Sequence, residues 1–143
     1  MASPAHTDLG GALRLAVLRL SRRLRQESAG EVTPSQLSAL TVLARHGELT
    51  LGELAAIERI APPSMTRIAA RLEEAGLLER RPDASDRRVA RVVLSDAGRK
   101  LVAASRQRGD AFVSSRLGAL TGEEQEVLAR AVPLLERLAS QDD

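Results

Sequence analysis

Apolar residues follow two different periods along this chain, and the change of period divides the chain into elements. Up to about residue 76 they recur every three or four positions, as on one face of a helix. From Leu77 to Leu94 they alternate with polar residues, as on a strand, and after Ser95 the helical period returns. The pattern therefore predicts a mainly α-helical chain with one β-hairpin between helices.

Local signals mark where these helices begin and end. Three capping boxes, at residues 33–36, 50–53 and 121–124, place a Thr before a helix and a Gln or Glu three residues later. Gly47 and Gly76 are typical of helix ends. We predict helices over about residues 8–28, 34–46, 51–59, 62–75, 96–117 and from 122 onward.

Two details of these helices can be predicted from their composition. Pro133 lies inside the last helix and is expected to kink it, because proline cannot donate the backbone hydrogen bond at that position. In the short helix that begins at residue 51, Leu54, Ala55 and Ile57 are expected to face the core.

The hairpin comes directly after the helix that starts at Pro62-Pro63. Residues 77–81 and 89–94 have the alternation of strands, and the polar loop between them is rich in turn formers. A helix, a short helix, a turn, a third helix and then a hairpin is the element order of a winged helix-turn-helix. The predicted fold class is thus mainly α, an α+β winged helix-turn-helix with a two-stranded wing and additional helices at both ends.

The helix before the hairpin has two chemically different faces. Met65, Ile68, Ala69 and Leu72 share one face and are expected to pack it onto the domain. The other face has no acid in its N-terminal half, whereas a recognition helix enters the major groove with its N-terminal residues first. The alternative is an ordinary amphipathic surface helix, which the acid-free face makes less favoured. The candidate base and phosphate contacts are Pro63, Ser64, Thr66, Arg67 and Arg71.

The hairpin loop is a second candidate contact with DNA. Arginine side chains suit a narrow minor groove, where the negative potential is enhanced. Asp86 is expected to hold an arginine by a charge-assisted pair rather than to touch DNA itself. Taken alone, the loop could equally be a solvated turn. The candidate wing residues are Arg81, Asp86, Arg87 and Arg88.

Composition excludes several classes of function. The 143 residues contain no cysteine, two histidines (His6 and His46) and one aromatic residue, Phe112, which is expected in the core. Thiol chemistry, iron–sulfur clusters and thiolate zinc sites are therefore excluded, and no metal site or cofactor is expected. No phosphate loop and no nucleophile with a plausible base is present, so we predict that the protein is not an enzyme.

Charge is distributed unevenly along the chain. Residues 59–100 hold ten basic and six acidic side chains, whereas residues 110–143 hold three basic and seven acidic ones. The middle of the chain is thus the part expected to meet an anion. A winged helix used only for contact with other proteins is the remaining alternative. No apolar run approaches the roughly 20 residues of a membrane span, and no secretory signal precedes the first helix, so a cytoplasmic location without membrane contact is expected.

Several motifs together resemble the MarR (multiple antibiotic resistance regulator) family. They are Leu-Ala-Ala-Ile at 54–57, Ser-Met-Thr-Arg-Ile at 64–68, the run from Leu72 to Arg80, Asp-Arg-Arg at 86–88 and Leu-Ser-Asp-Ala-Gly-Arg at 94–99. The resemblance implies a homodimer that binds a pseudo-palindromic operator in double-stranded DNA, typically as a repressor. It further implies that a wing arginine matching Arg87 or Arg88 reaches the minor groove, and that a small lipophilic effector can release the DNA.

The resemblance also implies how the single 1–143 chain is organised. Residues 33–94 would form the DNA-binding region, and residues 8–30 and 96–140 would form the dimerisation helices. The first helix also carries five arginines, which could follow phosphates or could cover dimer surface with their stems; the second reading agrees with the family. The dimerisation candidates are Leu9, Leu13, Val17, Leu128, Leu135 and Leu138.

Overall fold

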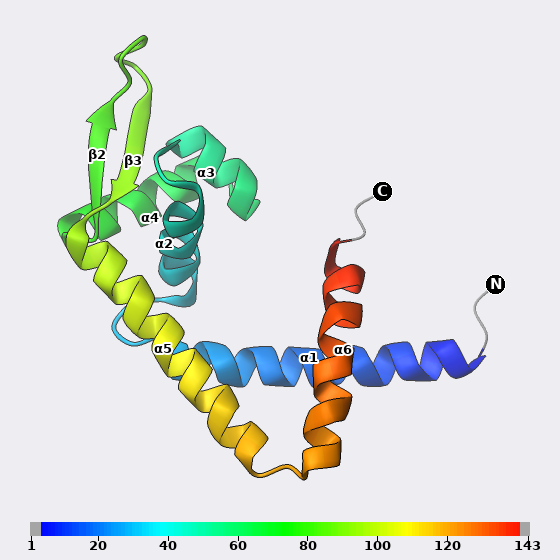
Figure 1. Ribbon diagram of the computed structural model, residues 1–143. Helices are drawn as coiled ribbons and strands as arrows, with labels where there is room; N and C mark the ends of the chain where they lie inside the picture. Colours follow the sequence, from blue (N-terminus) through cyan, green and yellow to red (C-terminus); the bar gives the residue numbers. More distant parts are fainter. Residues whose placement is uncertain (1–3, 141–143) are drawn as a thin grey trace. The chain divides into compact units, whose positions relative to one another are not determined.

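The computed structural model describes residues 4–140, which form six helices and three strands (Figure 1). The chain divides into two compact units, one ending at Gly109 and the other beginning at Asp110. The elements are α1 (Pro4–Ser28), α2 (Pro34–His46), β1 (Leu49–Thr50), α3 (Leu51–Glu58), α4 (Pro62–Glu74), β2 (Leu78–Pro82), β3 (Ala90–Leu94), α5 (Asp96–Gly118) and α6 (Gly122–Ser140). The predicted helices and hairpin are confirmed, with ends that differ by a few residues.

Two of the three predicted capping boxes are complete. The Thr33 hydroxyl accepts from the Gln36 N–H at 3.2 Å, and the Gln36 side chain accepts from the Thr33 N–H at 3.1 Å. Thr121 and Glu124 make the same reciprocal pair at the start of α6. At the start of α3 only half of the box forms. The Glu53 N–H donates to the Thr50 hydroxyl, but the Glu53 carboxylate accepts from that hydroxyl rather than from the Thr50 backbone N–H.

The sheet has three strands, one more than the sequence pattern indicates. Its order is β1-β3-β2, with both pairs antiparallel. Leu78 pairs with Leu94 at the base of the hairpin, and Pro82 pairs with Ala90 near its tip. β1 contributes only Leu49 and Thr50, which pair with Val92 and Arg91. A two-residue strand is too short to show a period, which explains why the pattern misses it.

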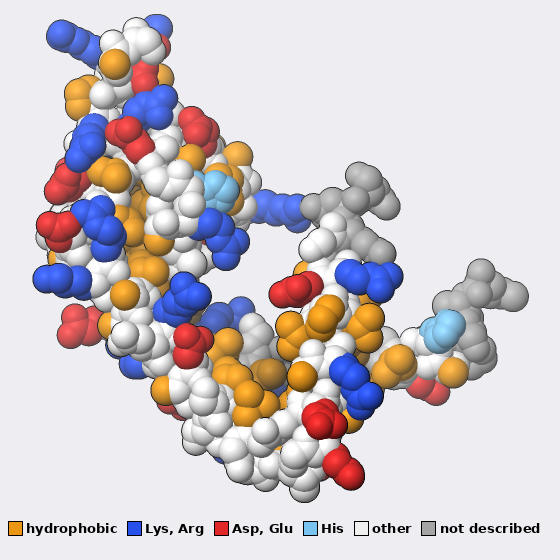
Figure 2. Space-filling model, viewed as in Figure 1, with side chains coloured by type: hydrophobic (Ala, Val, Ile, Leu, Met, Phe, Trp, Pro, Cys, Tyr) orange, Lys and Arg blue, Asp and Glu red, His pale blue; other side chains and the backbone are white. Residues whose placement is uncertain are grey.

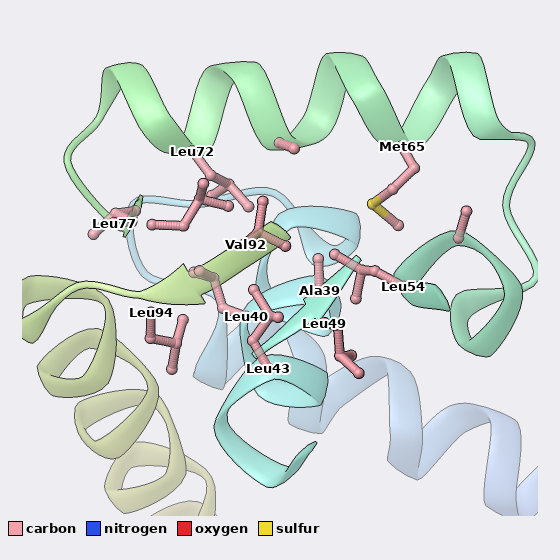
Figure 3. Packing of buried hydrophobic residues seen from close by; sticks show 13 residues of the cluster. Ala39, Leu40, Leu43, Leu49, Leu54, Met65, Leu72, Leu77, Val92 and Leu94 are labelled. Atoms are coloured by element: carbon pink, nitrogen blue, oxygen red, sulfur yellow. The ribbon is translucent and has the colours of Figure 1, made fainter. Parts of the chain in front are cut away.

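The core lies where α2, α3 and α4 meet the sheet. Figure 3 shows Leu72 of α4 beside Val92 of β3, and Met65 of α4 beside Leu54 of α3. The core has no aromatic side chain and is built from Leu, Ala, Val and Met. Its members are Ala39, Leu40, Leu43, Leu49, Leu54, Ala55, Met65, Ala69, Leu72, Leu77, Leu78, Val92 and Leu94.

The expectation that Ile57 faces the core is wrong. Its side chain is 44% exposed, whereas Leu54 and Ala55 are buried as expected. At 100° per residue, Ile57 lies about 110° around the helix from the midpoint of the two buried positions. Because α3 is only eight residues long, that flank does not turn back to the core; it borders a groove beside Leu37 of α2.

A compact joint, made of Gly76, Leu77, Ser95 and Gly98, connects the end of α4 to the start of α5. Gly76 ends α4 in the left-handed conformation, with φ of 74°, which glycine adopts without steric cost. The Ser95 hydroxyl caps α5 by accepting the Gly98 N–H at 3.0 Å, and it donates to the Gly76 carbonyl. The Ser95 N–H donates to the Leu77 carbonyl at 3.2 Å. The first turn of α5 is therefore fixed to the turn that follows α4.

A second contact fixes the end of α1 to α5. The Ser28 carbonyl accepts hydrogen bonds from the Ser105 hydroxyl and from the Arg108 guanidinium, both at 2.9 Å. A cation at a helix C-terminus is favourable because the exposed carbonyls carry partial negative charge. Gly109 lets the helices come close, since a Cβ there would lie 2.9 Å from the Ser28 hydroxyl oxygen.

The unit from Asp110 onward holds the end of α5 and all of α6. The Gln125 side-chain amide donates to the Leu117 and Leu120 carbonyls, which joins the two helices through the turn. The Arg116 guanidinium lies 5.2 Å from the centre of the Phe112 ring, and Phe112 is partly exposed rather than fully buried. Pro133 lies within α6 as expected.

The joint predicts that Gly98→Ala destabilises the protein. A Cβ at this position would lie 2.0 Å from the Leu77 carbonyl oxygen, which is backbone and cannot move aside without breaking the contact to Ser95. We expect a loss of about 1–3 kcal/mol or more in the free energy of unfolding, measured by urea denaturation.

Gly52→Ala is the matched control, because its Cβ would meet only the Thr50 hydroxyl oxygen, at an ordinary 3.9 Å. Gly52 lies in α3, where alanine is favoured over glycine by about 0.5–1 kcal/mol, so the control should be neutral or slightly stabilising. Equal midpoints for Gly98→Ala and the unmodified protein would contradict the close packing of the joint.

Candidate nucleic-acid interface

The two faces of α4 are divided as the sequence predicts. Met65, Ala69 and Leu72 are buried, and Ile68 packs against the same core. Burial of this stripe forces the opposite face outward, where Pro63, Thr66, Arg67, Ala70 and Arg71 are exposed and Ser64 is half-buried. The five recognition candidates therefore share one helix, and its first two turns carry no acid.

The N-terminus of α4 offers an unusual set of donors. Pro62 and Pro63 have no N–H, and the Ser64 and Met65 N–H groups both donate to the Ala61 carbonyl, at 2.9 and 3.1 Å. The backbone N–H groups that usually bind anions at a helix start are thus missing or occupied. Residues 62–65 therefore offer no free N–H to a phosphate or a base, and contacts from this turn of α4 fall to side chains.

Those side chains differ in what they can still bind. The Thr66 hydroxyl donates to the Pro62 carbonyl at 3.0 Å, which leaves its oxygen free as an acceptor. The guanidinium groups of Arg67 and Arg71 make no hydrogen bond or ion pair with any other residue between positions 4 and 140. Both guanidinium groups are exposed and keep their full donor capacity, which suits recognition of phosphate or of a guanine edge.

Arg59 is a candidate that sequence reasoning missed. It ends α3 with φ of 53° and ψ of 43°, the left-handed conformation that glycine usually takes at this place. Its side chain is exposed, directly before the turn into α4, and it pairs with no described residue. No sequence signal identifies Arg59, because a non-glycine residue in this conformation is recognised only once the backbone is known.

The wing is the β2–β3 hairpin, whose loop extends away from α2, α3 and α4 in Figure 1. Figure 2 shows basic side chains gathered at its outer end. The two candidate arginines at the tip differ in their contacts. Arg88 is held by Asp86, whose carboxylate accepts from Nε at 3.2 Å, from a terminal guanidinium nitrogen at 3.3 Å and from the Arg88 N–H at 3.0 Å. Arg87 has no partner among residues 4–140.

A second carboxylate organises the wing, and sequence reasoning did not assign it a role. Hydrogen bonds from the Ser85 hydroxyl, the Arg91 guanidinium and the Asp86 N–H hold the pKa of Asp83 well below its usual range. Because the pKa is lower in the folded state, this carboxylate contributes stability that is fully present above about pH 4 and is lost only as the pH falls through the lower folded value. The ion pair is thus intact at neutral pH.

Two further ion pairs involve arginines of β2. Arg80 donates to the Glu73 carboxylate at 3.0 Å, which ties β2 to the last turn of α4. Arg81, a predicted wing contact, lies 3.5 Å from the Glu79 carboxylate, with both side chains more than half exposed. A pair this exposed and this long contributes little, so Arg81 can exchange Glu79 for a phosphate.

The terminal helices expose large apolar side chains. On α1, Leu9, Leu15, Val17, Leu18 and Leu20 are between 45% and 65% exposed. On α6 the exposed set is Val127, Leu128, Val132, Leu134, Leu135 and Leu138, part of which is visible as orange side chains on α6 in Figure 2. Apolar surface of this extent is typical of a face that another protein covers.

Residues 4–140 contain neither a helix suited to a membrane nor a cluster suited to a metal ion. No helix there has the length and hydropathy required to cross a bilayer. No group of three or more His, Asp or Glu side chains in the same range is placed to hold a metal ion.

Comparison with known proteins assigns the chain to a family. Residues 32–90 match the MarR family model. An uncharacterized HTH-type transcriptional regulator of Mycobacterium bovis is 43% identical over 128 residues, which are 89% of this chain and 90% of that protein. The chain belongs to the MarR family. It is therefore a DNA-binding transcriptional regulator, in agreement with the winged-helix fold described above.

A further relative and a solved structure support the assignment of this chain to the MarR family. The HTH-type transcriptional repressor MdtR of Bacillus subtilis is 35% identical over 115 residues, 78% of this chain and 72% of that one. The crystal structure of a Pseudomonas aeruginosa protein assigned as a transcriptional regulator superposes with a TM-score of 0.86 at 34% identity, covering 98% of this chain and 100% of the other.

Proposed function

We propose that this MarR protein is a homodimeric repressor that binds a pseudo-palindromic operator through α4 and the wing. The observation that carries the proposal is the acid-free exposed half of α4, where Arg67 has no partner among the described residues, next to a hairpin with arginines at its tip. In the proposed complex, α4 of each subunit enters a major groove, with the two half-sites about 34 Å apart.

Contacts to DNA divide into base and phosphate contacts in this proposal. Arg67 reads a guanine through two parallel hydrogen bonds, and the Thr66 oxygen accepts from a base amino group, since its proton is already donated to Pro62. Ser64, Arg71 and Arg81 contact phosphates or bases at the edges, and Pro63 packs against the sugar–phosphate backbone. Phosphate contacts supply affinity, and base contacts supply sequence choice.

At the wing, we assign the minor-groove contact to Arg88 and a phosphate contact to Arg87. The Arg88 side chain is 91% exposed although Asp86 holds it through two of its nitrogens, so it is both extended and oriented before DNA arrives. An oriented arginine loses less conformational entropy on binding than a free one.

The homodimer is supported by the apolar side chains that α1 and α6 expose. A soluble monomer rarely leaves so many leucines and valines in water, and a second copy of the chain would cover them. Repression is supported by the relative MdtR, which is named a repressor.

A small lipophilic effector completes the proposal. A groove of about 380 Å³ lies between α2, β3 and α5, where Leu43, Val93 and Val102 supply an apolar lining and Arg99 and Arg106 supply positive charge. Such a lining suits an apolar molecule that carries an acidic group. Because α5 is fixed to the end of α4 at the joint, a ligand that displaces α5 would also displace the recognition helix.

Arg67→Ala should lower the affinity for the operator by about 1–3 kcal/mol and relax the sequence preference at one base pair of each half-site. The measurement is fluorescence anisotropy on a duplex identified by footprinting the DNA beside the protein's own gene. Each base pair is varied in turn, and each titration is run at about 50 and 200 mM salt, between which phosphate contacts lose much of their strength.

The outcomes separate the possible roles. Equal losses on every sequence would make Arg67 a phosphate contact instead of a base contact. Retention of no duplex by the unmodified protein at either salt concentration would reject DNA binding by this surface and favour a protein-binding winged helix.

Arg88→Ala should weaken operator binding by about tenfold or more, while Arg87→Ala should weaken it less and mainly flatten the salt dependence. The same anisotropy titration measures both variants, which remove the same charge from adjacent positions and so act as controls for each other. Larger losses for Arg87→Ala would reverse the assignment of the two arginines.

Placing a charge at Leu13 and Val17 together, as L13E/V17E, should convert the dimer to a monomer, because the two carboxylates would be buried in the subunit interface. Sedimentation velocity measures the mass, and circular dichroism checks that the helices remain. Gln26→Glu, which adds an acid at an exposed polar position of the same helix, should leave the dimer intact. A double variant that still sediments as a dimer would remove this part of α1 from the interface.

A further inference from the structure

The wing contains a carboxylate that is turned into the loop rather than out toward a ligand. The Asp83 side chain is only 10% exposed, although it lies directly after β2 in an otherwise open hairpin. One of its oxygens accepts the Ser85 and Asp86 N–H groups, at 3.1 and 3.0 Å, and the Ser85 hydroxyl. The other oxygen accepts Nε of Arg91.

We propose that Asp83 is a positioning residue for DNA binding, which holds the loop in the one conformation where Asp86 can orient Arg88. The inference rests on the proposed function, because it assigns Asp83 a role in operator binding through Arg88. Asp83 itself touches no DNA in this arrangement, since its oxygens are already occupied by donors from the loop and from β3.

The contacts form a continuous series from the sheet to the tip. Arg91 belongs to β3, the central strand, where it pairs with Thr50 of β1 on one side and Arg81 of β2 on the other. Arg91 holds Asp83, and Asp83 holds the backbone of Asp86. The Asp86 carbonyl accepts the Val89 N–H at 3.0 Å, and its carboxylate holds Arg88. The position of Arg88 is thus set from the sheet.

Because Asp83 is negatively charged, its role can be tested by whether its removal weakens or strengthens DNA binding. An acid at a DNA-binding tip repels phosphates, so its removal should strengthen binding if electrostatic attraction alone governs affinity. If Asp83 positions Arg88, its removal should weaken binding despite the gain of positive charge. The two explanations therefore predict opposite changes in the dissociation constant.

The expected size of the loss follows from the cost of ordering a long side chain on binding. Freeing Arg88 and the loop should weaken operator binding roughly three- to tenfold for Asp83→Ala. Asp83→Asn keeps an oxygen that accepts the Ser85 and Asp86 N–H groups but loses the ion pair to Arg91. It should therefore lose less affinity than Asp83→Ala.

The experiment measures operator affinity of the full-length protein by anisotropy, with Glu79→Gln as the matched control. Glu79 is also an acid of the wing paired with an arginine, Arg81, but it holds no part of the loop. Its replacement should leave affinity unchanged or raise it slightly. An affinity for Asp83→Ala equal to or higher than that of the unmodified protein would overturn the inference.

A double variant shows whether Asp83 acts through Arg88. If it does, adding Asp83→Ala to Arg88→Ala should weaken binding no further, because the side chain it positions is already absent. A further loss of the same size in the Arg88→Ala background would overturn the inference while leaving the DNA contact of Arg88 in place. Full operator affinity of Arg88→Ala alone would reject the wing contact of the proposed function itself.

Ser85→Ala keeps the test valid if the Asp83 variants fail to fold. It removes the hydroxyl that donates to Asp83 without changing any charge, so a loss of affinity cannot come from altered attraction to phosphate. We expect about a twofold loss with an unchanged melting temperature. Unchanged affinity for Ser85→Ala, with the fold intact, would overturn the proposal.

Discussion

The burial of one apolar stripe of α4 is the constraint on which the rest of the interface depends. Met65, Ala69 and Leu72 pack against α3 and the central strand, so the helix cannot rotate about its axis without exposing them. That fixed rotation is what presents Thr66, Arg67 and Arg71 to the outside. The proposed base-reading surface is thus a consequence of core packing, and it would change whenever the stripe were moved by one position along the helix.

The acidic side chains in this arginine-rich surface mainly form ion pairs with arginines of the same chain. Glu73 ties β2 to α4, Asp86 orients Arg88, and Asp83 fixes the loop to β3. Arg67 and Arg87 are left without a partner among the described residues, at the two places where DNA is proposed to bind. Pairing therefore distinguishes Arg80, which ties two elements together, from the unpaired Arg67, and the net charge of the region alone would not.

Elements with a clear hydrophobic period or a strong local signal could be predicted from the sequence. Features whose position depends on tertiary contacts could not. The helices, the hairpin and the buried face of α4 follow from spacing and from caps such as Thr33–Gln36. β1 has two residues and no period, Ile57 lies on the flank of a very short helix, and Asp83 was indistinguishable from a solvated turn residue. The Asp83–Arg91 pair spans eight positions across a hairpin, so its formation depends on the strand register, which only the structure supplies.

The joint at Gly76, Leu77, Ser95 and Gly98 couples the position of α5 to the position of α4. The turn after α4 and the first turn of α5 share hydrogen bonds, and Gly98 leaves no room between α5 and the Leu77 carbonyl. Further along α5, Ser105 and Arg108 hold the last carbonyl of α1. A displacement of α5 must therefore be shared by α1 and by the end of α4. Close packing without spare volume transmits such a displacement rather than absorbing it, which is the physical basis of the effector control proposed for the groove beside α5.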